Sequence, residues 1–120
     1  MEEENKSKIN HYVDLYLKDK KLPFTYSSVT VLDGSYTDDD NFFIELLFNE
    51  YNGGKYPHRN RVLCEAGTCS QIMYLDRGYP SAALEFDREM IPEDALKGLA
   101  RAAFFSSELT NNNGKSKNEH

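Results

Sequence analysis

The sequence has few of the residues that build active sites. Its 120 residues include three widely separated histidines, His11, His58 and His120, and two cysteines without neighbouring partners for a metal or nucleophile site. The glycines form no signature that would cradle a phosphate. These absences favour a protein that works through a surface rather than through a reactive pocket.

Long apolar runs are also missing. The longest, residues 42–44 and 46–48, are far too short to cross a bilayer, and residues 1–8 are charged where a secretory signal would be apolar. We therefore expect a cytoplasmic protein that does not bind membranes. Cys64 and Cys69 could face each other across a hairpin, but in the cytoplasm we expect free thiols.

Tryptophan is absent, yet 8 tyrosines and 7 phenylalanines supply large side chains for a core. Acidic residues outnumber basic ones by 20 to 14, which gives a net charge of -6. Such a field repels nucleic acid and attracts a basic protein surface. The chain is therefore expected to be one acidic domain whose partner is another protein, not nucleic acid.

Two segments have the spacing of an amphipathic helix. In residues 5–20 apolar side chains recur every three or four positions, and Pro23 ends the helix. In residues 92–106 Pro92 and the acids after it favour a helix start. The first stripe is Ile9, Tyr12, Val13, Tyr16 and Leu17, and the second is Leu96, Leu99, Ala100, Ala103 and Phe104. The breadth of the second stripe also suggests a homodimer.

The region between these helices has the composition of strands and turns. We expect a strand over residues 24–32, closed by a turn at Asp33 and Gly34. Residues 41–51 fit a helix or a strand, and we favour the strand because a hairpin would bury their large side chains. Residues 52–61 have the composition of a loop. Three short strands should follow, over residues 61–66, 69–76 and 80–87.

This order of elements predicts an α+β fold. We expect an antiparallel sheet of about five strands, with an N-terminal and a C-terminal amphipathic helix packed on one face. Residues 1–108 would form this single domain, and residues 109–120 would be a disordered C-terminal tail.

In element order alone, residues 5–106 resemble the small homodimeric chaperones of bacterial secretion systems. Those chaperones are acidic domains with a leading helix, a run of antiparallel strands and a final amphipathic helix. They place a helix between their strands, so a strand at residues 41–51 would depart from that family. The resemblance assigns a role to no residue.

A run of three acids is the first candidate binding feature. Asp38, Asp39 and Asp40 should lie at the exposed tip of a hairpin, where adjacent acids usually mark a solvated turn. Their spacing does not match a calcium-binding loop. Tyrosines are favoured at protein interfaces because they join a large apolar area to a polar tip. We therefore predict a partner-binding site of Asp38, Asp39, Asp40, Tyr36 and Tyr56, with no metal and no cofactor.

The second candidate is the basic part of the predicted loop. Lys55, His58, Arg59 and Arg61 concentrate positive charge in an acidic chain and could hold an anion. Without a helix terminus or a glycine nest, such a loop is more often a solvated connection. His58 could also act as a base for a cysteine nucleophile, although cysteines in a sheet are usually structural.

The leading hypothesis is a small acidic module that binds another macromolecule and inhibits, sequesters or chaperones it, without catalysis. The alternative is a small enzyme or ligand-binding domain that uses residues 55–61 to hold an anionic ligand, with His58 as acid or base and Arg59 or Arg61 as the clamp. A walled cleft around His58 would favour the enzyme, and a His58 that points to solvent would favour the binding module.

Overall fold

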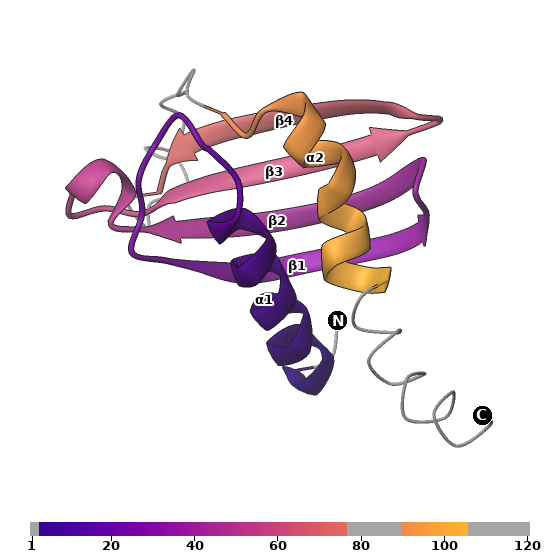
Figure 1. The fold of residues 1–120 in the computed structure, drawn as a ribbon, viewed down its shortest axis with the longest axis horizontal. Coiled ribbons are helices and arrows are strands. Elements are labelled where there is room, and N and C mark those ends of the chain that lie inside the picture. The colour runs from indigo at the N-terminus through magenta and orange to yellow at the C-terminus, as the bar shows by residue number, and fades with distance from the viewer. Residues whose placement is uncertain (1–2, 77–89, 106–120) are drawn as a thin grey trace.

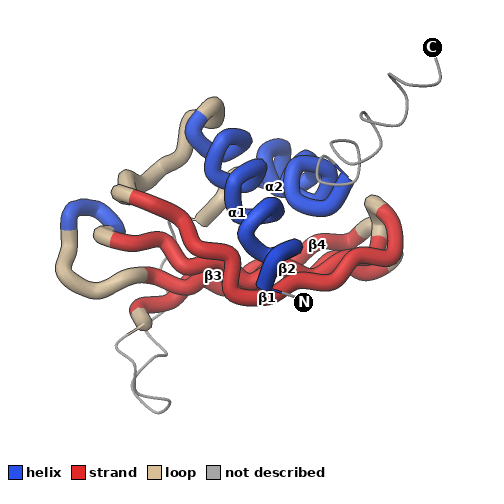
Figure 2. The backbone as a smooth tube through the Cα atoms, turned by 90° about the horizontal axis from the view of Figure 1, so that it is seen from below, coloured by secondary structure: helices blue, strands red, loops and turns tan. Residues whose placement is uncertain are grey.

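Two helices lie on one side of an antiparallel sheet. The structure is a computed structural model that describes residues 3–76 and 90–105. The strands pair in the order β1-β2-β3-β4, each antiparallel to the next (Figure 1). Seen along the sheet, α1 and α2 lie together over the same face (Figure 2). The elements are α1 Glu3–Lys18, β1 Ser28–Asp38, β2 Asn41–Asn49, the 3-10 turn η1 Tyr51–Gly53, β3 His58–Glu65, β4 Thr68–Leu75, α2 Glu93–Ala100 and the π-helical turn η2 Arg101–Phe105.

This architecture confirms the α+β class and the antiparallel sheet. The described sheet has four strands, whereas we expected about five. The predicted strand at 80–87, the domain limit at 108 and the tail at 109–120 lie outside the described residues. The second helix is shorter than expected because its last turn widens into η2.

Residues 41–51, which fitted two structures, form strand β2 over Asn41–Asn49. Alternate side chains of β2 are buried, and these are the large apolar residues Phe42, Ile44, Leu46 and Phe48. The strand was therefore correctly favoured, because the sheet buries that alternating set under the helices. The chain departs at this point from secretion chaperones, which have a helix between their strands.

The expected turn at Asp33 and Gly34 is wrong. β1 begins at Ser28, later than predicted, and runs through both residues to Asp38. Val31 pairs with Leu46 and Asp33 with Glu45, so Leu32 is an extra residue in β1. This bulge lets the strand continue, and the Asp33 carboxylate accepts a hydrogen bond from the Gly34 amide at 2.8 Å. The reversal comes instead at Asp39 and Asp40.

The expected loop at residues 52–61 is too long. β3 begins at His58, so the basic residues from His58 onward belong to a strand. The strand extends this far because His58 pairs with Phe48 of β2 and with Leu75 of β4. The two expected strands at 61–66 and 69–76 correspond to β3 and β4, with Ala66 and Gly67 in the turn.

The core lies between the sheet and the two helices. Its fully buried members include Val13 and Leu17 of α1, Leu96 and Leu99 of α2, and Ile44, Leu46, Phe48 and Val62 of the sheet.

α1 and α2 approach closely at Gly98. A methyl group there would collide with the Tyr16 hydroxyl, which donates a hydrogen bond to the Ala95 carbonyl at 2.7 Å. Burial, and then the charge of Asp94, raises the pKa of Tyr16, so this phenol remains a donor at neutral pH. A glycine at position 98 therefore allows the two helices to cover the sheet together.

Within the described residues, the helices are too short or too polar to cross a membrane.

Candidate functional site at the hairpin tips

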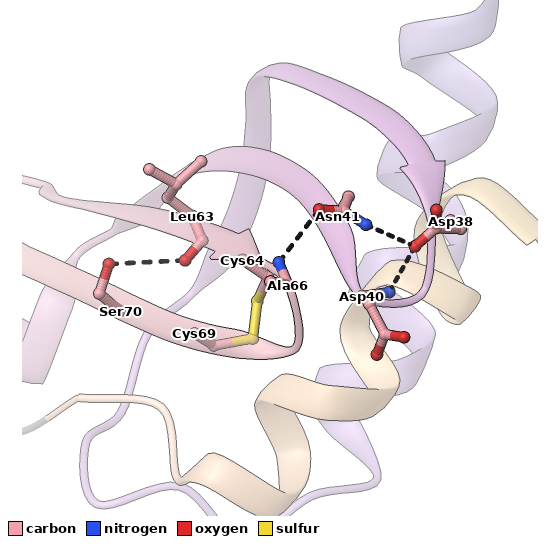
Figure 3. The surroundings of a disulfide bond; sticks show 8 residues. All are labelled: Asp38, Asp40, Asn41, Leu63, Cys64, Ala66, Cys69 and Ser70. Carbon is pink, nitrogen blue, oxygen red and sulfur yellow. Dashed lines mark hydrogen bonds between the residues drawn. A yellow bond between two sulfur atoms is a disulfide. The ribbon is translucent and has the colours of Figure 1, made fainter.

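The acidic turn between β1 and β2 is held in one shape by its own hydrogen bonds. Asp38 Oδ1 accepts from the Asp40 backbone N–H and from Asn41 Nδ2, both at 2.9 Å. Asp38 and Asp40 are exposed at this tip. The turn was correctly expected at the end of a hairpin, and these hydrogen bonds hold Asp38 and Asp40 in a defined arrangement (Figure 3).

The neighbouring turn between β3 and β4 is bonded to the acidic turn. The Gly67 N–H donates to the Asp40 carbonyl at 3.0 Å, and the Ala66 N–H donates to Asn41 Oδ1 at 3.1 Å. Both Ala66 and Gly67 have positive φ, as the two central residues of a tight hairpin turn of this type require. The two tips therefore form one unit, which we call the hairpin-tip site: residues 38–41, residues 64–69 and the facing side chains of Lys97 and Arg101.

A disulfide joins Cys64 and Cys69 beneath the β3–β4 turn, so the expectation of free thiols is wrong (Figure 3). The register places the two residues directly opposite each other, with their Cα atoms 4.0 Å apart. Cys64 is only 1% exposed, whereas Cys69 is half-buried. The sequence allowed this pairing across a hairpin, but the expected compartment favoured thiols.

Asp39 differs from its two neighbours because its carboxylate is bound within the protein. Arg101 donates to Asp39 Oδ2 from Nε at 2.7 Å and from Nη2 at 2.6 Å, and the Tyr36 hydroxyl donates to Oδ1 at 3.0 Å. The hydrogen bond from Arg101, followed by that from Tyr36, lowers the pKa of Asp39. The Tyr36 ring in turn stacks on Phe104, with centroids 5.5 Å apart. Asp39 and Tyr36 thus attach the end of the helical layer to the hairpin.

A cavity of about 440 Å³ lies between the tips and α2. Phe42 and Cys69 are among its lining residues, together with Asp40, Lys97 and Arg101. Opposite charges therefore face one cavity that also has apolar lining. Lys97 and Arg101 were missed from the sequence because they lie on the polar side of the last helix, where basic residues are usually solvated. Their spacing of four positions was the available signal.

Tyr56 does not join the hairpin-tip site. It is 44% exposed in the connection between β2 and β3, at the opposite end of those strands from the acidic turn. The Lys55 ammonium lies 5.6 Å from its ring centroid. The five residues predicted to bind a partner are therefore divided between two ends of the sheet.

The basic residues of the second candidate site do not all lie on one face of the sheet. Arg59 and Arg61 project from the face of β3 opposite the helices, and both pair with Glu45, at 3.5 Å and 3.0 Å. Arg59 also binds Asp76 Oδ2 at 2.7 Å. Strand alternation directs His58 to the other face, since its partner across the ladder is the buried Phe48.

His58 is held by ring stacking at the start of β3. Its ring stacks on Tyr51, with centroids 3.8 Å apart and planes at 20°, and the residue is half-buried. It therefore does not point freely to solvent, and it does not line the cavity between the hairpin tips and α2. Its position indicates a packing role at the end of the helix-covered face.

Among the described residues, no three histidine, cysteine or acidic side chains are placed to hold a metal ion. The chemistry available at the hairpin-tip site is that of exposed carboxylates, two cations and a disulfide. No family model, curated protein or solved structure matches the chain.

Proposed function

We propose that this chain is a small acidic protein-binding module that inhibits, sequesters or chaperones another macromolecule, and that it is not an enzyme. The observation that carries the proposal is the hydrogen-bonded unit made by the two hairpin tips, which presents Asp38 and Asp40 at one end of the sheet. The partner would be a protein with a basic surface, since the net charge of -6 opposes nucleic acid.

Rigidity at the tips favours binding because little freedom is lost when a partner docks. Backbone and side-chain hydrogen bonds already fix the acidic turn, and the disulfide fixes the turn beside it. A preorganised surface retains more of its interaction energy as affinity. Exposed carboxylates also accelerate encounter with a basic partner.

The set of proposed contact residues is smaller than the set predicted from the sequence. Asp38 and Asp40 are exposed, and Glu65 adds an exposed acid at the neighbouring turn. Asp39 and Tyr36 act as positioning residues, because they bind Arg101 and Phe104 within the protein. Tyr56 would contact the partner only if that partner reached the far end of the sheet.

A cytoplasmic location remains part of the proposal. The Cys64–Cys69 disulfide argues against this location, because glutathione keeps most cytoplasmic cysteines reduced.

The test compares charge variants of equal net charge. Immobilised wild-type protein, the Asp38→Asn/Asp40→Asn variant and the Asp19→Asn/Asp33→Asn control are exposed to a lysate of the source organism. We expect a basic protein to be retained by the wild type and the control but lost by the hairpin-tip variant. Its association rate with the hairpin-tip variant should be about tenfold lower at low ionic strength and converge with the wild-type rate at high salt.

The control separates location from charge. Asp19 and Asp33 are exposed acids outside the hairpin-tip site, so both double variants lose two negative charges. Equal association rates for the two variants across the salt series would show that the tips are not the contact surface. Recovery of small molecules alone would overturn the protein-binding function.

A further inference from the structure

The two outer strands of the sheet, β1 and β4, differ in how their free edges are covered. At the β1 edge, Asn10 of α1 accepts a hydrogen bond from Val31 N at 2.6 Å through Oδ1 and donates to Val29 O at 3.0 Å through Nδ2. A residue of a neighbouring strand would make the same pair of bonds. This part of the β1 edge is therefore closed by the protein itself.

β1 has two further features that oppose pairing with another chain. Its register with β2 shifts twice, and it carries Asp33, Gly34 and Asp38. Bulges and charges on outer strands are common protections against edge-to-edge association. Strand addition at β1 is thus opposed by irregular backbone and charge as well as by Asn10.

β4 lacks these protections. The strand Thr68–Leu75 contains no charged residue, proline or glycine. Its pairing with β3 continues from Glu65 and Thr68 to His58 and Leu75 without a shift. A long, regular and uncharged outer strand is a template for another strand.

The register identifies the backbone groups that β4 directs outward. The two-residue turn makes Glu65 and Thr68 a hydrogen-bonded pair, so Cys64 and Cys69 form a pair of the other kind, in agreement with their Cα separation of 4.0 Å. By alternation, the outward N–H and C=O groups belong to Cys69, Gln71, Met73 and Leu75.

These outward groups have no hydrogen-bond partner among residues 3–76 and 90–105. The chain returns beside β4 at Ile91, whose carbonyl accepts a hydrogen bond from the side chain of Gln71 at 2.7 Å. The backbone of Gln71 takes no part in that contact. Within the part of the chain that the structure describes, the outward backbone groups of β4 are therefore available to a neighbouring strand.

We propose that β4 pairs antiparallel with β4 of a second copy of this chain, which joins two four-stranded sheets into one sheet of eight strands. The two-fold axis passes between Ile72 and Ile72 of the second copy. In this register Gln71 faces Met73 of the second copy, and Cys69 faces Leu75. All the outward groups then form ladder hydrogen bonds.

The composition of β4 argues that the occupant is a second copy. The net charge of -6 opposes association of two copies, but β4 carries no charged residue, so pairing it with itself places no like charges opposite each other. The pairing also brings together two Ile72 side chains that are each 44% exposed in the single chain. This inference does not depend on the proposed function, because Asp38 and Asp40 lie outside β4.

The first experiment is sedimentation velocity on the full chain over about a hundredfold range of concentration. We expect the mass to double as concentration rises. Ile72→Lys places two like charges on the two-fold axis and should weaken the dimer at least about tenfold. Leu63→Lys is the matched control: Leu63 is 43% exposed on the same face but belongs to the inner strand β3, so its dimer should persist.

A second measurement identifies what occupies the edge. Ile72→Cys should form an intermolecular disulfide under mild oxidation, whereas Leu63→Cys should not. Amide exchange at Gln71 and Met73 should slow only at concentrations where the dimer forms. A monomer at every concentration, equal cross-linking of both cysteine variants, or slow exchange in the monomer would overturn the proposal; slow exchange in the monomer would mean that a strand of the same chain covers the edge.

Discussion

The same four strands give the sheet two faces of opposite chemistry. Along β2, Ile44 and Leu46 are fully buried beneath the helices, whereas Glu45 and Leu47 face the other way and are only half-buried. We call these the covered face and the open face. Of two neighbouring positions in one strand, one side chain therefore lies in the core and the other at the surface. Residue type alone does not determine how much a side chain stabilises the protein.

The covered face admits very few polar groups. Asn60 is its fully buried polar residue within the described ranges; Nδ2 donates to Gln71 Oε1 at 3.1 Å, while Oδ1 has no hydrogen-bond partner. Gln71 Nε2 continues the network to the Ile91 carbonyl. This chain of amides connects β3 and β4 to the segment that leads into α2. The polar groups of the covered face thus lie where the segment leading into α2 is hydrogen-bonded to the sheet.

The open face combines paired charges with exposed apolar side chains. Glu45 pairs with both Arg59 and Arg61, and the Arg61 guanidinium lies 5.9 Å from the centroid of the Phe43 ring. Leu63 and Ile72, on β3 and β4, are each more than two-fifths exposed. Ion pairs in this setting contribute little to stability. We conclude that the covered face provides most of the folding energy.

The strongest test of this contrast uses two adjacent leucines. Leu46→Ala leaves a cavity under the helices and should lower the free energy of unfolding by about 3 to 4 kcal/mol. Leu47→Ala removes the same atoms from the open face and should cost less than about 1 kcal/mol. Urea unfolding followed by circular dichroism measures both values.

The two leucine variants share a strand, a side chain and a substitution. They therefore control for strand propensity and for changes in the unfolded chain. Equal losses of stability would break the comparison between the faces, because they would show that the open face is buried in solution as deeply as the covered one.

The covered face was the part of the fold that the sequence could predict. The stripe in α1 and the alternation in β2 are periodic, and a period reports directly on which side chains are buried together. The turn predicted at Asp33 and Gly34 was wrong because the same dipeptide is favourable in a turn and next to a β-bulge. Only the pairing of β1 with Leu46 and Glu45 shows that a bulge is present here.

The candidate site was predictable only in part. The acidic turn was visible as three consecutive aspartates, but its partners come from distant positions: Arg101 is 62 residues from Asp39. The basic stretch looked like one site because its residues are adjacent in sequence. Because alternate residues of a strand point to opposite faces, His58 and Arg59 lie on opposite faces of the sheet. The four basic residues that are close in sequence therefore do not form one cluster in the fold.

Reduction of the disulfide measures how much a covalent link stabilises the end of the covered face. Reducing the Cys64–Cys69 bond releases a short loop, with a sequence separation of 5, and should lower the free energy of unfolding by about 2 kcal/mol. Urea unfolding with and without a phosphine reductant measures the difference. The loss should be smaller than that for Leu46→Ala, because reduction leaves both side chains in place.

A Cys64→Ala/Cys69→Ala variant is the control for reduction, since its stability should not respond to the phosphine. If the wild-type protein also fails to respond, the two cysteines are unpaired in solution. The expectation of free thiols would then hold for the purified protein. The hydrogen bonds between the hairpin tips would be sufficient to hold the two turns in place.

The smallest expected effect concerns the ion pair that joins the helical layer to the hairpin. The Arg101 hydrogen bond holds the pKa of Asp39 below its ordinary value of 3.8 in the folded protein. A lowered folded-state pKa means that the unfolded chain binds the proton more readily, so Asp39 stabilises the folded protein above its ordinary pKa of 3.8, and this contribution is lost as pH falls through the folded-state pKa. Arg101→Gln should bring the pKa of Asp39 back towards its ordinary value and reduce the acid sensitivity of unfolding.

Carbon-detected NMR titration of the Asp39 carboxyl, with urea unfolding at neutral and acidic pH, measures both parts of this effect. Lys97→Gln is the matched control, because it removes a neighbouring cation of α2 that has no ion pair with any residue in the described part of the chain. If the two variants shift the Asp39 titration equally, the general positive charge of α2 lowers the pKa. A shift confined to Arg101→Gln would identify one specific bond as the polar link between the covered face and the hairpin-tip site.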